Sequence, residues 1–221
     1  MGEKSSKQPL VWVDCEMTGL DIINDEIIQI ACYVTDHDLN LLEESGFETV
    51  VHQPKEKMDA MGDWCIKTHA KTGLTERVLS SEVTPESAAE SLLQYIQKYI
   101  PDAGKAILAG NSVHYDKEFL RKGPYVSTLN HLHHRILDVS SIKEAARRWS
   151  APHIVKKVPK KKGTHEARQD ILESIEEARY YRDVLFRSQV ANEDESKAEQ
   201  SQPKQPKQKK AKTEHPTTTA T

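Results

Sequence analysis

The sequence is poor in cysteine, in long apolar runs and in any excess of one charge. Its 3 cysteines among 221 residues show no CxxC spacing of a zinc site and are too few for a disulfide framework, which predicts a reducing compartment. No apolar run is long enough to cross a bilayer, so we expect no membrane segment. With a formal net charge of −3, any contact with nucleic acid must be local. We expect an intracellular protein, first in the cytoplasm, with mitochondria or the nucleus as alternatives.

The apolar pattern divides the chain into three parts. Residues 1–8 are polar, lack the apolar core of a secretory signal and are expected to be disordered. Residues 9–188 carry the periodic apolar positions of one domain, interrupted by a basic loop at 156–163 that we expect to be mobile. The tail, 189–221, is rich in Lys, Gln, Pro and Thr, which predicts disorder. Its Lys-rich centre is a candidate nuclear signal, RNA-contacting arm or solubilising segment.

Residues 9–188 begin with an antiparallel pattern and continue with strands that alternate with helices. Thr84 and Pro85 form a helix start, with a capping hydroxyl followed by proline at the first helical position. Strands are expected at 10–13, 26–34, 41–51, 106–109 and 135–139, and helices after Thr84, from about Tyr115, over 140–149 and over 166–187. This order predicts an α/β fold, in which a mixed sheet is flanked by helices.

Two carboxylates follow the first expected strand. Because alternate side chains of a strand share a face, Asp14 and Glu16 point the same way. Their charges repel, and neither is followed by a Lys or Arg placed to pair with it. A hard divalent cation such as Mg²⁺ would relieve that repulsion. An isolated Asp-x-Glu is more often a solvated strand end, so this pattern needs support from elsewhere in the chain.

Asp116, His165 and Asp170 supply that support as a group. Asp116 begins a helix after a Gly-Asn-Ser turn, and the other two flank the start of the last helix. Two divalent ions about 4 Å apart require several carboxylates, with Asp14 as a possible bridge between them. A neutral His165 beside the attacking water would suit general base catalysis of phosphodiester hydrolysis. Taken singly, each has a simpler interpretation as a helix-start charge or an exposed side chain.

The segments that carry these residues, WVDCEMTGL at 12–20, GNSVHYD at 110–116 and HEARQD at 165–170, resemble the three exonuclease motifs of the oligoribonuclease family. That family belongs to the DEDDh 3′-to-5′ exonucleases, with a ribonuclease H-like fold. The resemblance covers nearly all of residues 9–188. Further blocks at 135–140 and 146–149, and Asp63-Trp64 with His69, resemble oligoribonucleases rather than DNA proofreaders.

The resemblance implies a homodimer that uses two Mg²⁺ or Mn²⁺ ions to cut short single-stranded RNA, down to dinucleotides, into nucleoside 5′-monophosphates. It implies four metal ligands, Asp14, Glu16, Asp116 and Asp170, and His165 as the base. For the substrate, it implies that Leu20 wedges between two bases, Trp64 packs beside them and His69 lies near the terminal nucleotide. It also implies a 5′-phosphate cap of Ser112, Ser140 and Arg135 of the partner subunit. For Leu20, Trp64 and Ser140 the alternative is ordinary core or cap packing.

One departure from the family is His134, which stands where the family usually has Tyr, ahead of Arg135. We expect it to retain part of the Tyr's contact with substrate. Together with His131 and His133 it could suggest a metal site, but no acid or Cys completes the set, so we expect a partly exposed interface loop. Two other functions stay open: an exonuclease for longer RNA or DNA ends, and a catalytically silent RNA-binding protein. The presence of all four acids and His165 argues against the silent protein.

Overall fold

The computed structural model describes residues 7–163 and 166–187, and these contain a mixed five-stranded sheet. Its order is β3-β2-β1-β4-β5. Strand β2 runs antiparallel to both β1 and β3, whereas β4 runs parallel to β1 and β5 runs parallel to β4. The predicted architecture, an antiparallel meander followed by parallel strands, is therefore present. The strands are β1 (Leu10–Met17), β2 (Ile27–Thr35), β3 (Phe47–Val50), β4 (Ile107–Gly110) and β5 (His133–Asp138).

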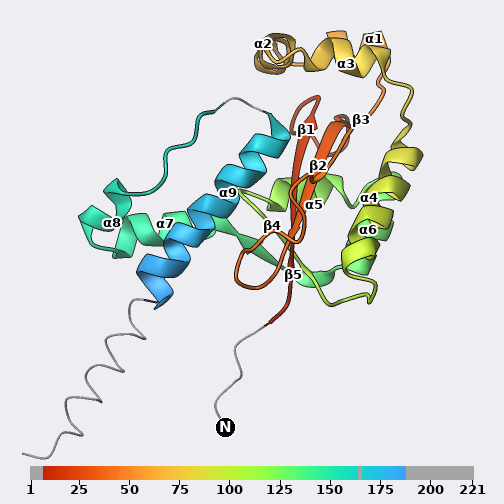
Figure 1. Ribbon diagram of the computed structural model, residues 1–221. Helices are drawn as coiled ribbons and strands as arrows, with labels where there is room; N and C mark the ends of the chain where they lie inside the picture. The colour runs from red at the N-terminus through yellow and green to blue at the C-terminus, as the bar shows by residue number, and fades with distance from the viewer. Residues whose placement is uncertain (1–6, 164–165, 188–221) are drawn as a thin grey trace, which may run out of the picture.

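Helices cover both faces of the sheet. In Figure 1, α4 and α6 lie on one side and α9 on the other, with α7 and α8 next to α9, while α1 to α3 lie beyond one end of the sheet. None of the helices in the described ranges is long and apolar enough to span a bilayer. The helices are α1 (Lys55–Asp59), α2 (Asp63–Lys71), α3 (Leu74–Ser80), α4 (Pro85–Tyr99), α5 (His114–Phe119), α6 (Val126–His131), α7 (Val139–Trp149), α8 (Pro152–Lys156) and α9 (Ala167–Tyr181).

The alternation of side chains along β1 assigns its residues to two separate cores. Val11 and Val13 point into the core beneath α4, whereas Trp12 points into the core beneath α9. Trp12 is fully buried there, and its indole N–H donates to the Thr35 hydroxyl at 3.0 Å. Asp14 and Glu16 continue the Trp12 side of the strand, so they face the helix that carries Asp170.

Several boundaries differ from the prediction. The strand expected at 41–51 is shortened to Phe47–Val50, and Leu41 forms only an isolated bridge with Thr35. Between them the carboxylate of Glu43 accepts the backbone N–H groups of Ser45 and Gly46. Gly46 has φ +65°, and a Cβ there would lie 2.5 Å from the Tyr33 ring. This turn over an aromatic ring interrupts the strand.

The histidine cluster was predicted to lie in a partly exposed interface loop, and the loop part of this prediction was wrong. His131 ends α6 and is 8 % exposed, with Nε2 2.8 Å from the Ile100 carbonyl oxygen, while His133 and His134 begin β5. Helices α3, α6 and α8 were not predicted, and the last helix ends at Tyr181 rather than at 187, with a π-helical turn over 182–187.

Candidate active site

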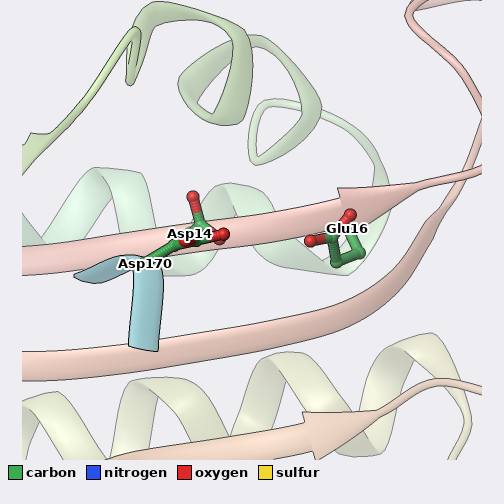
Figure 2. Close-up of side chains that lie close together, drawn as sticks. All are labelled: Asp14, Glu16 and Asp170. Carbon is green, nitrogen blue, oxygen red and sulfur yellow. The ribbon is translucent and has the colours of Figure 1, made fainter. Parts of the chain in front are cut away.

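Three of the predicted metal ligands meet between β1 and α9. Asp14 and Glu16 project from β1, and Asp170 from the first turn of α9 (Figure 2). One carboxylate oxygen of each lies within 4.8 Å of the others. Alternation places the first two on one face of the strand, and the buried apolar stripe of α9 fixes the third above them.

Burial and mutual repulsion make this cluster unfavourable when every carboxylate is ionised. Burial raises the pKa of Asp14 well above its ordinary value, and the charges of Asp116, Glu16 and Asp170 raise it further. The pKa of Glu16 rises to about 7, first because of burial and then because of Asp170 and Asp116. A compact set of hard oxygen donors that repel one another fits a divalent cation such as Mg²⁺ or Mn²⁺.

Asp116, the fourth predicted metal ligand, lies next to this cluster. It lies in the first turn of α5, is 6 % exposed, and its Oδ1 accepts the backbone N–H of Cys15 at 2.8 Å. Burial raises its pKa to about 6, against hydrogen bonds from Cys15 that lower it. It is not one of the three acids within 4.8 Å of one another, but its charge raises the pKa of both Asp14 and Glu16. Its carboxylate therefore acts on the same electrostatic centre.

The two serines predicted to cap a phosphate lie together. The Ser112 hydroxyl donates to the Ser140 hydroxyl at 3.1 Å, and the backbone N–H groups of both residues donate to Asp138 Oδ1 at 2.9 Å. Ser112 has φ +53°, a conformation that is unusual outside glycine and is often found at functional sites. The supporting role of Asp138 was missed: the helix was expected from 140, whereas α7 begins at Val139 with Asp138 as its N-cap.

The predicted base-contacting residues differ in exposure. Leu20 and Trp64 are 64 % and 61 % exposed, which excludes the alternative that they pack in the core. His69 is instead 2 % exposed, and its Nε2 lies 3.0 Å from the Met17 carbonyl oxygen. Its Nδ1 lies 4.0 Å from Glu16 Oε2, so this histidine contacts one carboxylate of the acidic cluster.

The remaining predicted residues lie at the sheet edge or outside the described ranges. His134 and Arg135 are exposed on β5, which ends the strand order. The ring of His134 stacks on that of His133, with centroids 4.2 Å apart, and the His134 carbonyl oxygen accepts from Lys117 Nζ at 2.7 Å. His165 lies outside the described residues, so its role as general base stays a prediction.

Comparison with known proteins identifies the family. The RNase_T family model, described as an exonuclease, matches residues 11–178. A human protein named "Oligoribonuclease, mitochondrial" is 46 % identical over 188 residues, which cover 85 % of this chain and 77 % of that one. The Saccharomyces cerevisiae protein of the same name is 48 % identical over 183 residues, covering 80 % and 67 %. An "Oligoribonuclease" of Vibrio campbellii is 44 % identical over 183 residues, covering 82 % and 98 %.

Solved structures match the fold. The structure "Exonuclease I (apo)" has a TM-score of 0.60 and 16 % identity, and the match covers 82 % of this chain but 43 % of that one. E. coli Exonuclease I in complex with a dA16 oligonucleotide has a TM-score of 0.56 and 17 % identity, with coverage of 82 % and 42 %. The predicted ribonuclease H-like fold and the predicted enzyme class, a 3′-to-5′ exoribonuclease, are confirmed. The chain belongs to the oligoribonuclease family of exonucleases.

Proposed function

We propose that this chain cuts short single-stranded RNA from its 3′ end, down to dinucleotides, and releases nucleoside 5′-monophosphates. The observation that carries the proposal is the cluster of Asp14, Glu16 and Asp170, with Asp116 beside it. Phosphodiester hydrolysis at such a cluster needs cations, because carboxylates alone would repel the phosphate. The oligoribonuclease names of the relatives support RNA as the substrate.

Two divalent ions, Mg²⁺ or Mn²⁺, would be held by these four carboxylates. Bound ions of this kind lower the pKa of water and offset charge on the phosphate oxygens. The protein supplies the remaining groups. His165, placed by sequence ahead of α9, is proposed as the base that takes the proton of the attacking water. The exposed Leu20 and Trp64 offer apolar surface to the bases, and the buried His69 holds the end of β1 beside Glu16.

Selection for short substrates is assigned to the cap formed by Ser112 and Ser140. The two hydroxyls are hydrogen-bonded to one another, and the backbone N–H groups of both residues donate to Asp138, so the two serines form a preorganised group suited to a terminal phosphate. Arg135 of the partner subunit would complete this cap, since a guanidinium fork matches phosphate oxygens.

We infer a homodimer, because the proposed phosphate cap needs Arg135 from a second copy of the chain. His134 and Arg135 are exposed on an edge strand, where they can reach a second copy of the chain. Trp149, at the end of α7, is 81 % exposed, and Phe186 beyond α9 is 58 % exposed; both line a single cavity with Ile142 and Leu185. Large exposed apolar side chains of this kind are typical of interaction surfaces. Light scattering during size-exclusion chromatography should give twice the chain mass of 25.1 kDa.

A length series of end-labelled RNA tests the function. The protein is incubated with Mg²⁺ or Mn²⁺ and RNAs of two to twenty nucleotides, beside matched DNA, and the products are separated by chromatography. We expect the highest kcat/KM for the shortest RNAs, with nucleoside 5′-monophosphates as products. Preferential trimming of the longer RNAs or of DNA would replace the proposal with a broader exonuclease. Absence of hydrolysis by the intact chain would leave an RNA-binding protein.

A further inference from the structure

The basic loop between α8 and α9 brings one lysine to the side of the proposed metal site. Lys161 Nζ donates to the hydroxyl of Ser174 on α9 at 3.1 Å. Ser174 is only 4 % exposed, so Lys161, itself an exposed residue, reaches a buried acceptor. The next residue is fixed to the same helix, since the Lys162 backbone N–H donates to the Glu173 carboxylate at 3.1 Å.

Ser174 joins this lysine to both halves of the site. Its hydroxyl donates to the Asp170 carbonyl oxygen at 2.7 Å and accepts from Asn111 Nδ2 at 2.7 Å, so with Lys161 it uses one donor and two acceptor positions. The Asn111 side-chain oxygen in turn accepts from the Ser140 hydroxyl at 3.1 Å. A continuous set of hydrogen bonds therefore connects Lys161, the backbone of a proposed metal ligand and the proposed phosphate cap.

The charge of Lys161 also acts on the acidic cluster. Its ammonium lowers the pKa of Asp14, in opposition to burial and to the neighbouring carboxylates. An ammonium has three N–H donors, and Ser174 occupies one of them. The other two are available for an anion placed between the acids and the serines, which is where the proposed function puts the phosphodiester.

We propose that Lys161 is a substrate-binding residue that donates to a non-bridging oxygen of the scissile phosphodiester. This inference rests on the proposed function, because it needs an oligonucleotide bound between the acidic cluster and the phosphate cap formed by Ser112 and Ser140. A lysine at this place adds positive charge on the protein side of the phosphate, where four carboxylates would otherwise repel it. Neighbouring Lys160 lines the same cavity between the loop and α9 as Lys161, but of the two only Lys161 donates to Ser174, so Lys160 provides a matched control.

The test compares wild type, Lys161→Met, Lys161→Arg and Lys160→Met in Mg²⁺-dependent hydrolysis of a short RNA over a range of KCl concentrations. We expect Lys161→Met to raise KM about tenfold, as loss of a hydrogen bond to a charged group predicts. The slope of log KM against log salt should become shallower by up to about 0.7, because one phosphate contact is lost. Lys161→Arg should restore the wild-type slope, and Lys160→Met should match wild type.

Two outcomes would overturn the inference while leaving the proposed function intact. One is a Lys161→Met enzyme with the wild-type KM and salt slope. The other is a raised KM with an unchanged salt slope that Lys161→Arg does not restore, which would show that the lysine only holds the loop on α9. If wild type itself fails to cut short RNA, the proposed function fails first and the inference falls with it.

Discussion

At the scale of single residues, the site depends on a change of chemistry along one strand. Trp12 and Asp14 lie on the same side of β1, but Trp12 is buried in an apolar core, whereas Asp14 meets Glu16 and Asp170. Burying carboxylates next to one another is unfavourable without a compensating cation. Four neighbouring carboxylates contribute to this unfavourable environment, which is why each of them is expected to matter more for function than for folding.

Asp14→Asn should reduce kcat/KM for dinucleotide hydrolysis by more than about 100-fold. Substitution of a residue that only supports a metal ligand typically lowers activity by roughly 10–100-fold, and loss of a ligand itself should lower it further. The fold should persist, since the substitution removes a charge that is costly to bury. Asp59→Asn is the matched control, because Asp59 forms an exposed ion pair with Lys55 that contributes little to stability. Steady-state kinetics and circular dichroism provide the measurement. Substantial turnover by folded Asp14→Asn would refute the metal-ligand assignment.

His134→Ala should raise KM for a 5′-phosphorylated dinucleotide about tenfold, because stacking on a base contributes roughly 1–3 kcal/mol. His134→Tyr should keep KM close to the wild-type value, because its ring can stack on the same base. KM is measured for the three proteins under the same conditions. If His134→Ala matches wild type, this residue does not reach a substrate, and the contribution across the dimer is withdrawn.

At the scale of elements, the helices that carry the site were predictable where their signals are local. The stripe of Ile171, Ile175 and Ala178 predicted α9, and this stripe packs against Trp12 and Tyr33 on the sheet. Because the stripe fixes the rotation of the helix, it also directs Asp170 toward β1. The Thr84-Pro85 pair likewise predicted the start of α4, where the Thr84 hydroxyl accepts the Ser87 N–H at 3.2 Å.

Thr84→Ala should lower the free energy of unfolding by about 1 kcal/mol, the usual contribution of a hydroxyl N-cap. Activity per folded molecule should stay unchanged, because α4 packs on the face of the sheet opposite the acids. Thr84→Ser is the matched control, since it retains the capping hydroxyl. Urea denaturation monitored by circular dichroism gives the free energy of unfolding of each protein, and steady-state kinetics give the activity. A loss of stability in Thr84→Ser as large as in Thr84→Ala would show that the hydroxyl is not the cause.

Features set by tertiary contacts could not be predicted. The interruption before β3 depends on Gly46 lying against the ring of Tyr33, two residues that are far apart until the sheet forms. The burial of His69 beside Glu16 depends on how α2 meets the end of β1. Lys161 was predicted only as part of a basic loop, because its acceptor on Ser174 is defined by the packing of that loop on α9.

At the scale of the whole molecule, the acidic cluster couples metal binding to stability. The pKa values of Glu16 and Asp116 rise from 4.5 and 3.8 to about 7 and about 6. The folded, metal-free protein therefore binds more protons than the unfolded chain between about pH 4 and pH 7, so its stability must fall as pH rises through that window.

The expected result is a Tm of the metal-free protein that decreases from pH 5 to pH 8, and that Mg²⁺ restores most strongly at pH 8. Thermal denaturation in EDTA and in excess Mg²⁺, at the same ionic strength, provides the measurement. Asp14→Asn should show a smaller decrease, because one of the repelling charges is absent. A Tm of the metal-free protein that rises over this range would mean that the carboxylates are compensated in some other way.

Titration calorimetry of Mn²⁺ binding at pH 6.5, in two buffers of different protonation enthalpy, tests most directly that these carboxylates form a metal centre. We predict two ions bound per chain. Binding should release protons, because the pKa values of about 7 for Glu16 and about 6 for Asp116 leave both partly protonated at this pH. Asp14→Asn should lose most of the binding. No binding to wild type, or equal binding to Asp14→Asn, would contradict the assignment.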